Sequence, residues 1–345
     1  MKKVATIILS LGSIIGVIQA ETHAVLAGGS IQAKIDLAVD GDIVAIFGGT
    51  YNQDLTITKR IRLVEINGQD VIITGAVTFT SVADCPPFEG FTVGSNGNKN
   101  IVVNDCTGLV ISGIDHTAGG HIEVNDSDIK ITDSALRTFI HNDGVTALSS
   151  SSLTGKIDQN GGELNVSDVT VAGNFDTGND AAKTVAFRTT VTGDCNWRSK
   201  LSWFGYGKSK RFRFEGSNAK IVFVGSEIDD AGNADGFYME GSKNFLLVCN
   251  SIIKGTKSQN RDNDTNIEVI GDDHVVRIFN NYLEKTHNYD GSDHPNVLCR
   301  SKDVILANNS TSNAGASGYM FNVPFGATVI NNHSVGQGLM SEVRG

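Results

Sequence analysis

The chain has 345 residues and a formal net charge of −10 at pH 7, and 39 of its residues are Gly whereas only 4 are Pro. The acidic balance argues against nucleic-acid binding, because phosphate contacts need clustered Lys and Arg. The five cysteines form no CxxC pair, which argues against metal–thiolate chemistry, and their odd number leaves their pairing open. A glycine-rich chain of this length is sufficient for one long solenoid.

Residues 1–20 have the pattern of a secretory signal peptide. Two lysines precede an apolar run that ends at Ile18, and Ala20 supplies a small residue at the cleavage position. The run is too short for a membrane-spanning helix, and no lipoprotein cysteine follows it. We therefore expect a secreted or periplasmic protein without membrane insertion, in which residues 21–345 form a single domain.

A short helix is predicted within residues 30–40. Ser30 suits the N-cap position, and Gly41 suits the C-terminal stop. The apolar face of this helix would consist of Ile31, Ile35, Ala38 and Val39. Short strands are then expected at 43–47, 55–57, 61–64, 71–74 and 77–79. A helix that leads into stacked strands is expected to cap the open edge of a solenoid.

The same segment carries a family resemblance. The phrase SIQAKIDLAVDGDIVAIFGGTYNQDLTITKRIRLV resembles the opening of secreted right-handed parallel β-helix proteins of the pectin-lyase-like superfamily. The resemblance covers about residues 30–75 and implies an all-β chain, folded as a single-stranded right-handed parallel β-helix with an N-terminal capping helix. It implies no single activity, because this superfamily includes lyases, hydrolases, esterases, adhesins and proteins without enzyme activity.

Short apolar strands that end in asparagine recur in the second half of the chain, in the phrases FLLVCNSI, VVRIFNNYL, VILANNST and TVINNHS. The asparagines are Asn250, Asn281, Asn309 and Asn332, at steps of 31, 28 and 23 residues. Equivalent side chains of stacked coils lie above one another, so we expect these amides to form a hydrogen-bonded ladder. Earlier coils are expected to use Ser112, Ser134, Ser151, Ser167 and Thr189. The next such residue, Ser226, follows Thr189 by 37 residues, which predicts an insertion between them.

The predicted insertion, Cys195–Glu215, mixes basic and aromatic residues. Aromatic faces stack on sugar rings and guanidinium groups pair with carboxylates, so this stretch predicts a subsite for an acidic polysaccharide. The candidate substrate-binding residues are Trp203, Tyr206, Lys208, Lys210, Arg211 and Arg213, joined by Lys257 from a later loop. The alternative is one bulky coil whose aromatic side chains fill the core and whose basic side chains pair with acids.

An acidic turn follows at residues 228–236. It resembles the Ile-Asp-His … Asp-Gly stretch of pectate lyases, in which aspartates bind calcium that bridges to the substrate carboxylate. The resemblance implies a calcium site at Asp229, Asp230 and Asp235, since calcium requires several oxygen ligands. The alternative is a solvated acidic turn.

Two polar loops, after Asn250 and Asn281, are expected to emerge side by side. This placement would bring Lys257 and Arg261 near His287, Tyr289 and His294. A uronate lyase needs a cation against the carboxylate and a base for the adjacent ring proton, so Arg261, His287, Tyr289 and His294 are the candidate catalytic residues. The alternative is two polar loops with no common role.

A second resemblance supports the lyase hypothesis. The phrase IEVIGDDHVVRIFNNYLEKT is similar to one found in alginate and chondroitin lyases with β-helix folds. We therefore predict a secreted protein that acts on or binds an acidic polysaccharide, by β-elimination if it is an enzyme. The competing hypothesis is a non-enzymatic surface, adhesin-like or structural β-helix, and the oligomeric state is left open.

Overall fold

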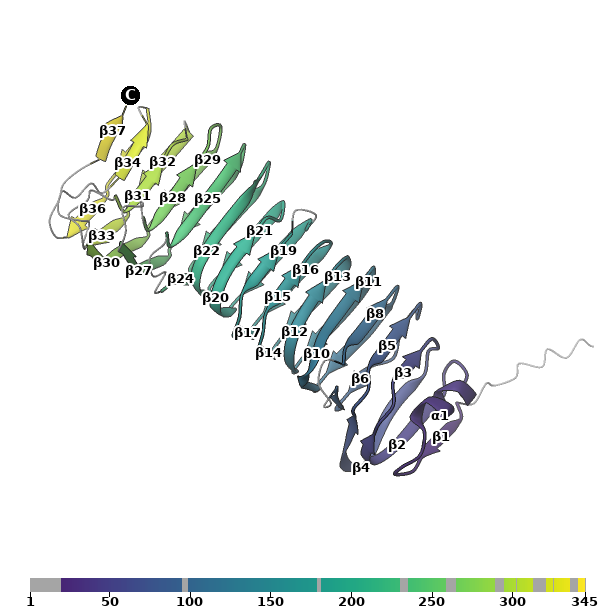
Figure 1. The fold of residues 1–345 in the computed structure, drawn as a ribbon. Coiled ribbons are helices and arrows are strands. Elements are labelled where there is room, and N and C mark those ends of the chain that lie inside the picture. The colour runs from purple at the N-terminus through teal and green to yellow at the C-terminus, as the bar shows by residue number, and fades with distance from the viewer. Residues whose placement is uncertain are drawn as a thin grey trace, which may run out of the picture.

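The computed structural model describes residues 20–94, 99–178, 181–229, 235–258, 265–288, 295–301, 303–312, 321–324, 326–335 and 341–344. Their strands stack in parallel into an elongated β-solenoid of about 13 turns (Figure 1). The predicted parallel β-helix is therefore confirmed. The predicted signal peptide lies outside the described residues except for Ala20. Among the described residues, no helix is both long enough and apolar enough to cross a membrane.

The strands form two sheets that run the length of the solenoid. The twelve-strand sheet contains β6 (Phe88–Glu89), β9 (Thr107–Ser112), β11 (Ser127–Thr132), β13 (Gly144–Ser149), β16 (Glu163–Ser167), β19 (Lys183–Phe187), β21 (Leu201–Gly205), β23 (Lys220–Val224), β26 (Phe245–Cys249), β29 (Val275–Phe279), β32 (Asp303–Ala307) and β35 (Thr328–Ile330).

The twenty-five-strand sheet contains β1 (Thr22–Val25), β2 (Ile43–Tyr51), β3 (Leu55–Ile57), β4 (Arg62–Ile73), β5 (Val77–Thr80), β7 (Thr92–Val93), β8 (Ile101–Asn104), β10 (Asp115–Asn125), β12 (Ala135–His141), β14 (Ser152–Leu153), β15 (Ile157–Gln159), β17 (Thr170–Val171), β18 (Phe175–Thr177), β20 (Thr190–Trp197), β22 (Lys208–Ser217), β24 (Glu227–Ile228), β25 (Phe237–Ser242), β27 (Ile252–Ser258), β28 (Ile267–Ile270), β30 (Tyr282–Asn288), β31 (Val297–Cys299), β33 (Ser310–Ser312), β34 (Phe321–Pro324), β36 (His333–Val335) and β37 (Ser341–Arg344).

The helix α1 (Ile31–Leu37) is shorter than expected. Its N-cap is confirmed, because the Ser30 hydroxyl accepts a hydrogen bond from the Ala33 N–H at 3.1 Å. The helix ends before Ala38, and Val39 is 58% exposed rather than part of the buried face. α1 packs against β1, β2 and β3 at the first coils, and its role as a cap stays a prediction.

The predicted asparagine ladder exists, but Asn250 does not belong to it. The Asn281 Oδ1 accepts a hydrogen bond from the Ser251 N–H at 2.9 Å, and the Asn309 Oδ1 accepts one from the Asn281 N–H at 3.0 Å. Ser251 therefore holds the ladder position in its coil. Asn250 lies one residue earlier, at φ 53°, in the left-handed conformation that Asn tolerates at turns. Its equivalents in the next coils are Asn280, Asn308 and Asn331, all with positive φ.

The expected insertion between Thr189 and Ser226 is wrong. Strands β19, β21 and β23 pair in continuous register, so this stretch contains a complete coil. Gly207 occupies the ladder position of that coil, and its N–H donates to the Ser226 Oγ at 3.2 Å. Because its ladder residue has no side chain, this coil lacks the polar residue by which the other coils are identified in the sequence.

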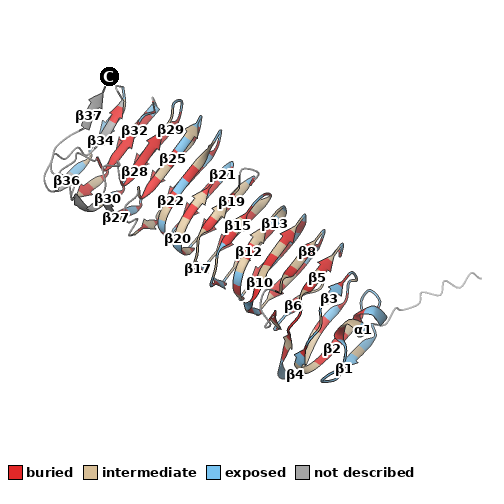
Figure 2. Cartoon of the chain, in the orientation of Figure 1, coloured by how far each residue is buried: buried red, intermediate tan, exposed pale blue. Residues whose placement is uncertain are grey.

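Alternation along each strand places one set of side chains inside the solenoid, where burial is nearly complete (Figure 2). One part of this core is aromatic, where Phe212 contacts Trp197, Phe204, Phe223 and Phe237 with ring centroids 5.0 to 5.7 Å apart. The outward set of side chains is what the solenoid offers to a ligand.

Candidate functional site

One outward row of polar side chains crosses five coils of the twenty-five-strand sheet. Its members are Asp158 on β15, Asp176 on β18, Asn196 on β20, Arg213 on β22 and Tyr238 on β25. Each is the direct register partner of the next, so the side chains repeat along the solenoid axis at the strand spacing of about 4.8 Å. We call this set the polar row.

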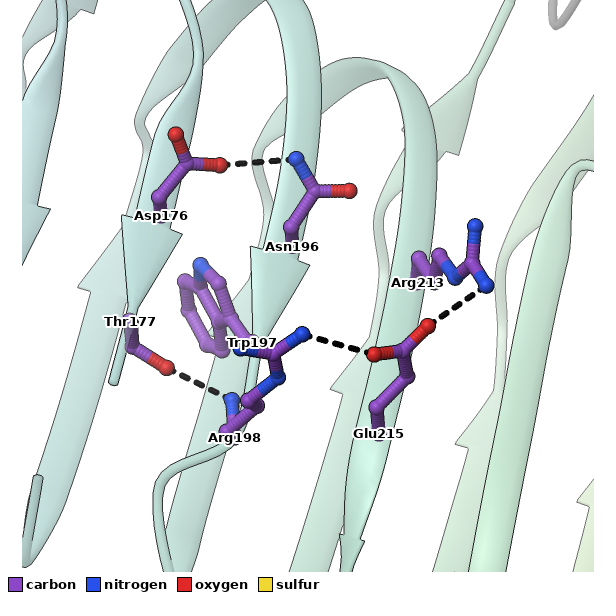
Figure 3. Close-up of a pocket in the computed structure, with 7 residues that line it drawn as sticks. All are labelled: Asp176, Thr177, Asn196, Trp197, Arg198, Arg213 and Glu215. Carbon is purple, nitrogen blue, oxygen red and sulfur yellow. Dashed lines mark hydrogen bonds and ion pairs between the residues drawn. The ribbon is translucent and has the colours of Figure 1, made fainter. Parts of the chain in front are cut away.

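A cleft of about 290 Å³ lies at the centre of the polar row (Figure 3). It is lined by Asp176, Thr177, Asn196, Trp197, Arg198, Arg213 and Glu215. The chain is anchored there by the Arg198 N–H, which donates to the Thr177 hydroxyl at 2.6 Å. Because Trp197 is fully buried, the accessible chemistry of the cleft comes from its polar residues.

Two arginines share one carboxylate in this cleft. The Arg198 Nη2 donates to the Glu215 Oε2 at 2.8 Å, and the Arg213 Nη2 lies 2.5 Å from the Glu215 Oε1. The hydrogen bond from Arg198, together with the charge of Arg213, holds the pKa of Glu215 below its usual range. Within the described residues these contacts engage only Nη2 of each guanidinium, which leaves further N–H donors for a ligand.

The acidic end of the polar row consists of two neighbouring carboxylates. Asp158 lies 2.7 Å from the Lys156 Nζ, and Asp176 accepts a hydrogen bond from the Asn196 Nδ2 at 2.7 Å. Burial raises the pKa of Asp176, the hydrogen bond from Asn196 opposes this effect, and the charge of Asp158 adds to it. The pKa of Asp176 is therefore shifted upward, whereas the pKa of Glu215 in the same cleft is shifted downward.

Tyr238 is the last exposed member of the row, because its register partner on β28, Glu268, is buried. The Arg213 guanidinium lies 5.0 Å from the centre of the Tyr238 ring, and the Tyr238 hydroxyl donates to the Glu240 Oε2 at 2.6 Å. Burial, and then the bond to Glu240, raises the pKa of Tyr238, so the phenol stays neutral at physiological pH.

The predicted substrate-binding residues do not converge on one subsite. Trp203, 41% exposed, points outward from the twelve-strand sheet. Tyr206 and Lys208 line a second hollow of about 450 Å³ at a turn. Lys210 is exposed on β22, close in sequence to Arg213 of the polar row. Of the predicted residues whose side chains the structure describes, only Arg213 lines the central cleft, and the side chain of Lys257 lies outside the described part.

The basic side chains of this stretch are mostly paired, as the alternative interpretation expected. Lys208 lies 3.0 Å from Asp229, and Arg211 forms an ion pair with Asp194. The aromatic side chains Trp197, Phe204, Phe212 and Phe214 are fully buried. These ion pairs lower the local positive charge on which the polysaccharide prediction relied.

The two described members of the predicted calcium site, Asp229 and Asp235, have separate partners within the protein. Asp229 holds Lys208, and Asp235 accepts hydrogen bonds from the backbone and the hydroxyl of Thr265 at 2.6 and 3.1 Å. Asp230 lies outside the described residues. No group of three His, Cys, Asp or Glu side chains close enough to hold a metal occurs in the described part of the chain, and the calcium site stays a prediction.

The two strands that carry the predicted catalytic loops lie side by side. β27 pairs with β30, and Lys257 is the register partner of His287. Arg261, Tyr289 and His294 lie outside the described residues. The catalytic roles of all four residues therefore stay predictions.

The polar row itself was missed in the sequence. Asp176, Asn196 and Arg213 each stand between two inward apolar or small residues in their strands, in the phrases FDT, CNW and FRF. That alternation marks each of them as outward, but it does not show that they share one register.

No protein-family model and no curated protein sequence matches the chain. Among solved structures, the mannuronan C-5 epimerase AlgE4 A-module from Azotobacter vinelandii is similar over 91% of this chain and 96% of that chain, with 13% identity and a TM-score of 0.39. The AlgE6 A-module of the same organism is similar over 90% and 91%, with 12% identity and a TM-score of 0.34. Similarity at this level carries no argument about activity, and the fold assignment rests on the strand pairing itself.

Proposed function

We propose that the protein binds an acidic polysaccharide along the polar row. The observation that carries the proposal is that Arg198 and Arg213 both bind the Glu215 carboxylate. This carboxylate fixes the two guanidinium groups at the edge of one cleft. A guanidinium offers a planar fork that suits the carboxylate of a uronic acid, and a fixed guanidinium loses little entropy on binding.

The periodicity of the row supports a linear polymer as the ligand. Each coil adds one outward side chain at about 4.8 Å, a distance similar to the length of one sugar in an extended chain. A polymer that lies along the solenoid axis would meet Asp176, Asn196, Arg213 and Tyr238 in turn. The acids at Asp158 and Asp176 would hydrogen-bond sugar hydroxyls, since charged acceptors make the stronger hydrogen bonds.

Retention in gels that contain the polymer tests this proposal. Native protein should migrate more slowly in alginate, pectate or chondroitin, and the double variant Arg198→Ala/Arg213→Ala should lose the retardation. The single variants Arg198→Ala and Arg213→Ala should each weaken the retardation, and Lys130→Ala, which removes one exposed positive charge from the other sheet, is their matched control. No retardation on any of these polymers, or equal retardation of the double variant and the control, would refute the proposal.

We further propose that, if the protein is an enzyme, it is a lyase that acts by β-elimination near the loops of Lys257 and His287. Support comes from the register of these two residues on neighbouring strands. Incubation of the mature protein with the three polymers, with and without calcium, should then give unsaturated products that absorb ultraviolet light. Absence of product under both conditions would reject the lyase.

A non-enzymatic surface protein is the second candidate. The observation that favours it is that Lys208 is paired with Asp229, and Arg211 with Asp194. These ion pairs neutralise positive charges that a lyase would direct at its substrate. Retardation without product would identify this candidate.

A further inference from the structure

The hollow of about 450 Å³ lies at the turn that leads from the twelve-strand sheet into the twenty-five-strand sheet, and we call it the turn hollow. Two glycines line it, Gly207 at the ladder position of its coil and Gly225 in the turn of the next coil. In the coils that follow, the equivalent positions are occupied by Ser226 and Asn250 respectively. The two absent side chains therefore open the surface at this point.

Tyr206, which also lines the turn hollow, occupies a turn position that does not favour a bulky residue. Between residues 113 and 331, one residue of each coil has a positive φ at this turn. Apart from Arg188 and Tyr206 these residues are Gly, Asp, Ser or Asn, such as Asp133, Asn280 and Asn308, and they tolerate the left-handed conformation. Tyr206 has φ 53°, which is rare for an aromatic residue. The turn does not explain the tyrosine, and an outlier of this kind is a reason to look for a function.

The Tyr206 ring is held in place and is still open to solvent. A Cβ at Gly225 would lie 2.7 Å from the Tyr206 Cε1 and 2.8 Å from its Cδ1, so the ring lies directly against the glycine backbone. The Phe187 ring meets the Tyr206 ring edge to face, with the centroids 5.6 Å apart. Tyr206 is nevertheless 61% exposed, and its hydroxyl has no hydrogen-bond partner among the described residues. A fixed ring with an exposed face can stack on the C–H face of a pyranose.

The charged groups on the sheet side of the turn hollow are paired with one another. The Lys208 Nζ lies 3.0 Å from the Asp229 Oδ2 and 3.7 Å from the Glu227 Oε1. The Lys254 Nζ lies 2.9 Å from the same Glu227 oxygen. Two lysines therefore balance two carboxylates, so an acidic sugar would have to compete with the protein for these cations. Sugar hydroxyls, in contrast, can hydrogen-bond to charged groups without separating the pairs.

The turn side of the hollow is polar but also balanced in charge. The Arg188 guanidinium donates two hydrogen bonds of 2.6 Å to the Asp168 carboxylate. The Asn250 Oδ1 accepts a hydrogen bond from the Asn280 Nδ2 at 3.3 Å, which leaves the Asn250 Nδ2 as a donor for a ligand. An exposed aromatic face surrounded by hydrogen-bonding groups with no net charge suits a neutral sugar.

We propose that the turn hollow binds a neutral pyranose, stacked on Tyr206 and hydrogen-bonded by Glu227 and Asn250. This site is separate from the polar row. Thr190, which lines the turn hollow, is the first residue of β20, whereas Asn196 of the polar row lies near the other end of that strand. The proposal therefore adds a neutral ligand to the acidic polymer that we assign to the polar row, and it does not depend on that assignment.

Retardation in gels that contain hydroxyethyl cellulose, galactomannan or dextran tests the proposal. At least one of these neutral polymers should slow the native protein, and Tyr206→Asn should weaken that binding about tenfold, because it removes the stacking face. Tyr206→Phe keeps the ring and should bind almost like the native protein. Asn is the chain's own residue at equivalent turns, so Tyr206→Asn should fold, which chemical denaturation verifies. No retardation by any of the three polymers, or equal retardation of Tyr206→Asn and the native protein, would overturn the proposal.

Two glycine variants test whether the Tyr206 ring must lie where it does. Gly225→Asn suits the left-handed turn, but its Cβ would displace the Tyr206 ring, so it should weaken the binding about as much as Tyr206→Asn does. Gly113→Asn is the matched control, because Gly113 has the same φ of 59° and a Cβ there would lie 3.9 Å from its nearest neighbour. This control should bind like the native protein. Equal binding by the two glycine variants would contradict the proposed stacking.

The double variant Arg198→Ala/Arg213→Ala separates this site from the polar row. The neutral polymer should retard it like the native protein, whereas acidic polymers should no longer do so. Loss of both effects in this variant would place the neutral sugar in the polar row and overturn the proposal. A native protein that only acidic polymers retard would also overturn it, and would leave the assignment of the polar row intact.

Discussion

Asn281 stabilises three neighbouring backbone and side-chain groups at once. Its Oδ1 accepts from the Ser251 N–H, and its Nδ2 donates to the Val248 carbonyl and to the Asn309 Oδ1, both at 3.0 Å. Asn281→Leu would remove all three of these bonds and would leave the buried Ser251 N–H without this acceptor. We expect the free energy of unfolding to fall by roughly 1–3 kcal/mol, measured by chemical denaturation.

Asn280→Gly is the matched control for that variant. The Asn280 side chain makes one exposed contact, to Asn250 at 3.3 Å, and its backbone has φ 55°. Gly adopts this conformation without strain, so the stability of Asn280→Gly should be almost unchanged. If the two variants lose equal stability, the buried ladder does not have the role assigned to it.

Two buried histidines predict an acid-sensitive stability. His116 and His141 are fully buried, and burial lowers the pKa of each below its ordinary 6.5. The folded protein therefore keeps them neutral while the unfolded chain takes up protons. Their contribution to the free energy of unfolding is complete above the pKa that they have in the unfolded chain. It is lost as the pH falls from that value through their lower pKa in the folded protein.

The free energy of unfolding should thus decrease below about pH 6.5, with a slope that approaches about 1.4 kcal/mol per pH unit for each histidine. Denaturant titrations between about pH 7.5 and about pH 5.5 measure this slope. His141→Gln should make it shallower. A slope that is the same in the variant and the native protein would show that His141 does not contribute.

At the residue scale, sequence patterns predict where the turns lie, but not which residue of a turn occupies the ladder position. Asn250 and Asn281 both end an apolar strand, yet one occupies the left-handed turn and the other the ladder. The phrases CNS and FNNY differ in whether the polar pair is Asn-Ser or Asn-Asn. Ser and Asn both serve as ladder residues, so only backbone conformation separates the two positions.

At the element scale, the coil that contains β21 and β22 shows how one glycine obscures a repeat. A Cβ at Gly207 would lie 2.5 Å from the Thr189 carbonyl oxygen and 2.8 Å from the Phe204 ring. The large aromatic core of this coil therefore excludes a ladder side chain. That packing is a tertiary property, which explains why the sequence suggested an insertion instead.

Gly207→Ala should consequently destabilise the protein by roughly 1–3 kcal/mol, since a well-packed core resists an added methyl group. Thermal unfolding of the variant measures the effect. Gly178→Ala is the comparison, because a Cβ there would approach its nearest neighbour, the Asn160 carbonyl oxygen, only to 3.1 Å. Equal losses in the two variants would contradict the packing argument.

The strands themselves were largely predictable, whereas the cleft was not. Short apolar runs bounded by Gly, Asn and Asp predicted strands and turns from local chemistry. The cleft, in contrast, is formed by residues such as Asp176, Asn196 and Arg213, which belong to three coils. Their proximity depends on the length of every coil between them. Glu215 gains its role through Arg213 on its own strand and through Arg198, which follows the neighbouring strand β20.

At the scale of the whole molecule, the polar row that we propose as a binding surface belongs to one sheet. It lies on five strands of the twenty-five-strand sheet. The parallel β-helix was predictable because its repeat recurs along the entire chain. The function was less so, because it depends on which few of many outward residues share a register.

The most direct test of the central claim is calorimetric titration with acidic oligosaccharides of increasing length, taken from the polymer that retards the protein most. If the polymer follows the polar row, affinity should rise until the oligosaccharide spans its five coils and then level off. Arg213→Ala should weaken the binding of the longest oligosaccharide by roughly 1.5–3 kcal/mol, about tenfold or more, with little change in stability. Affinity that is independent of length, or unchanged in Arg213→Ala, would contradict the account.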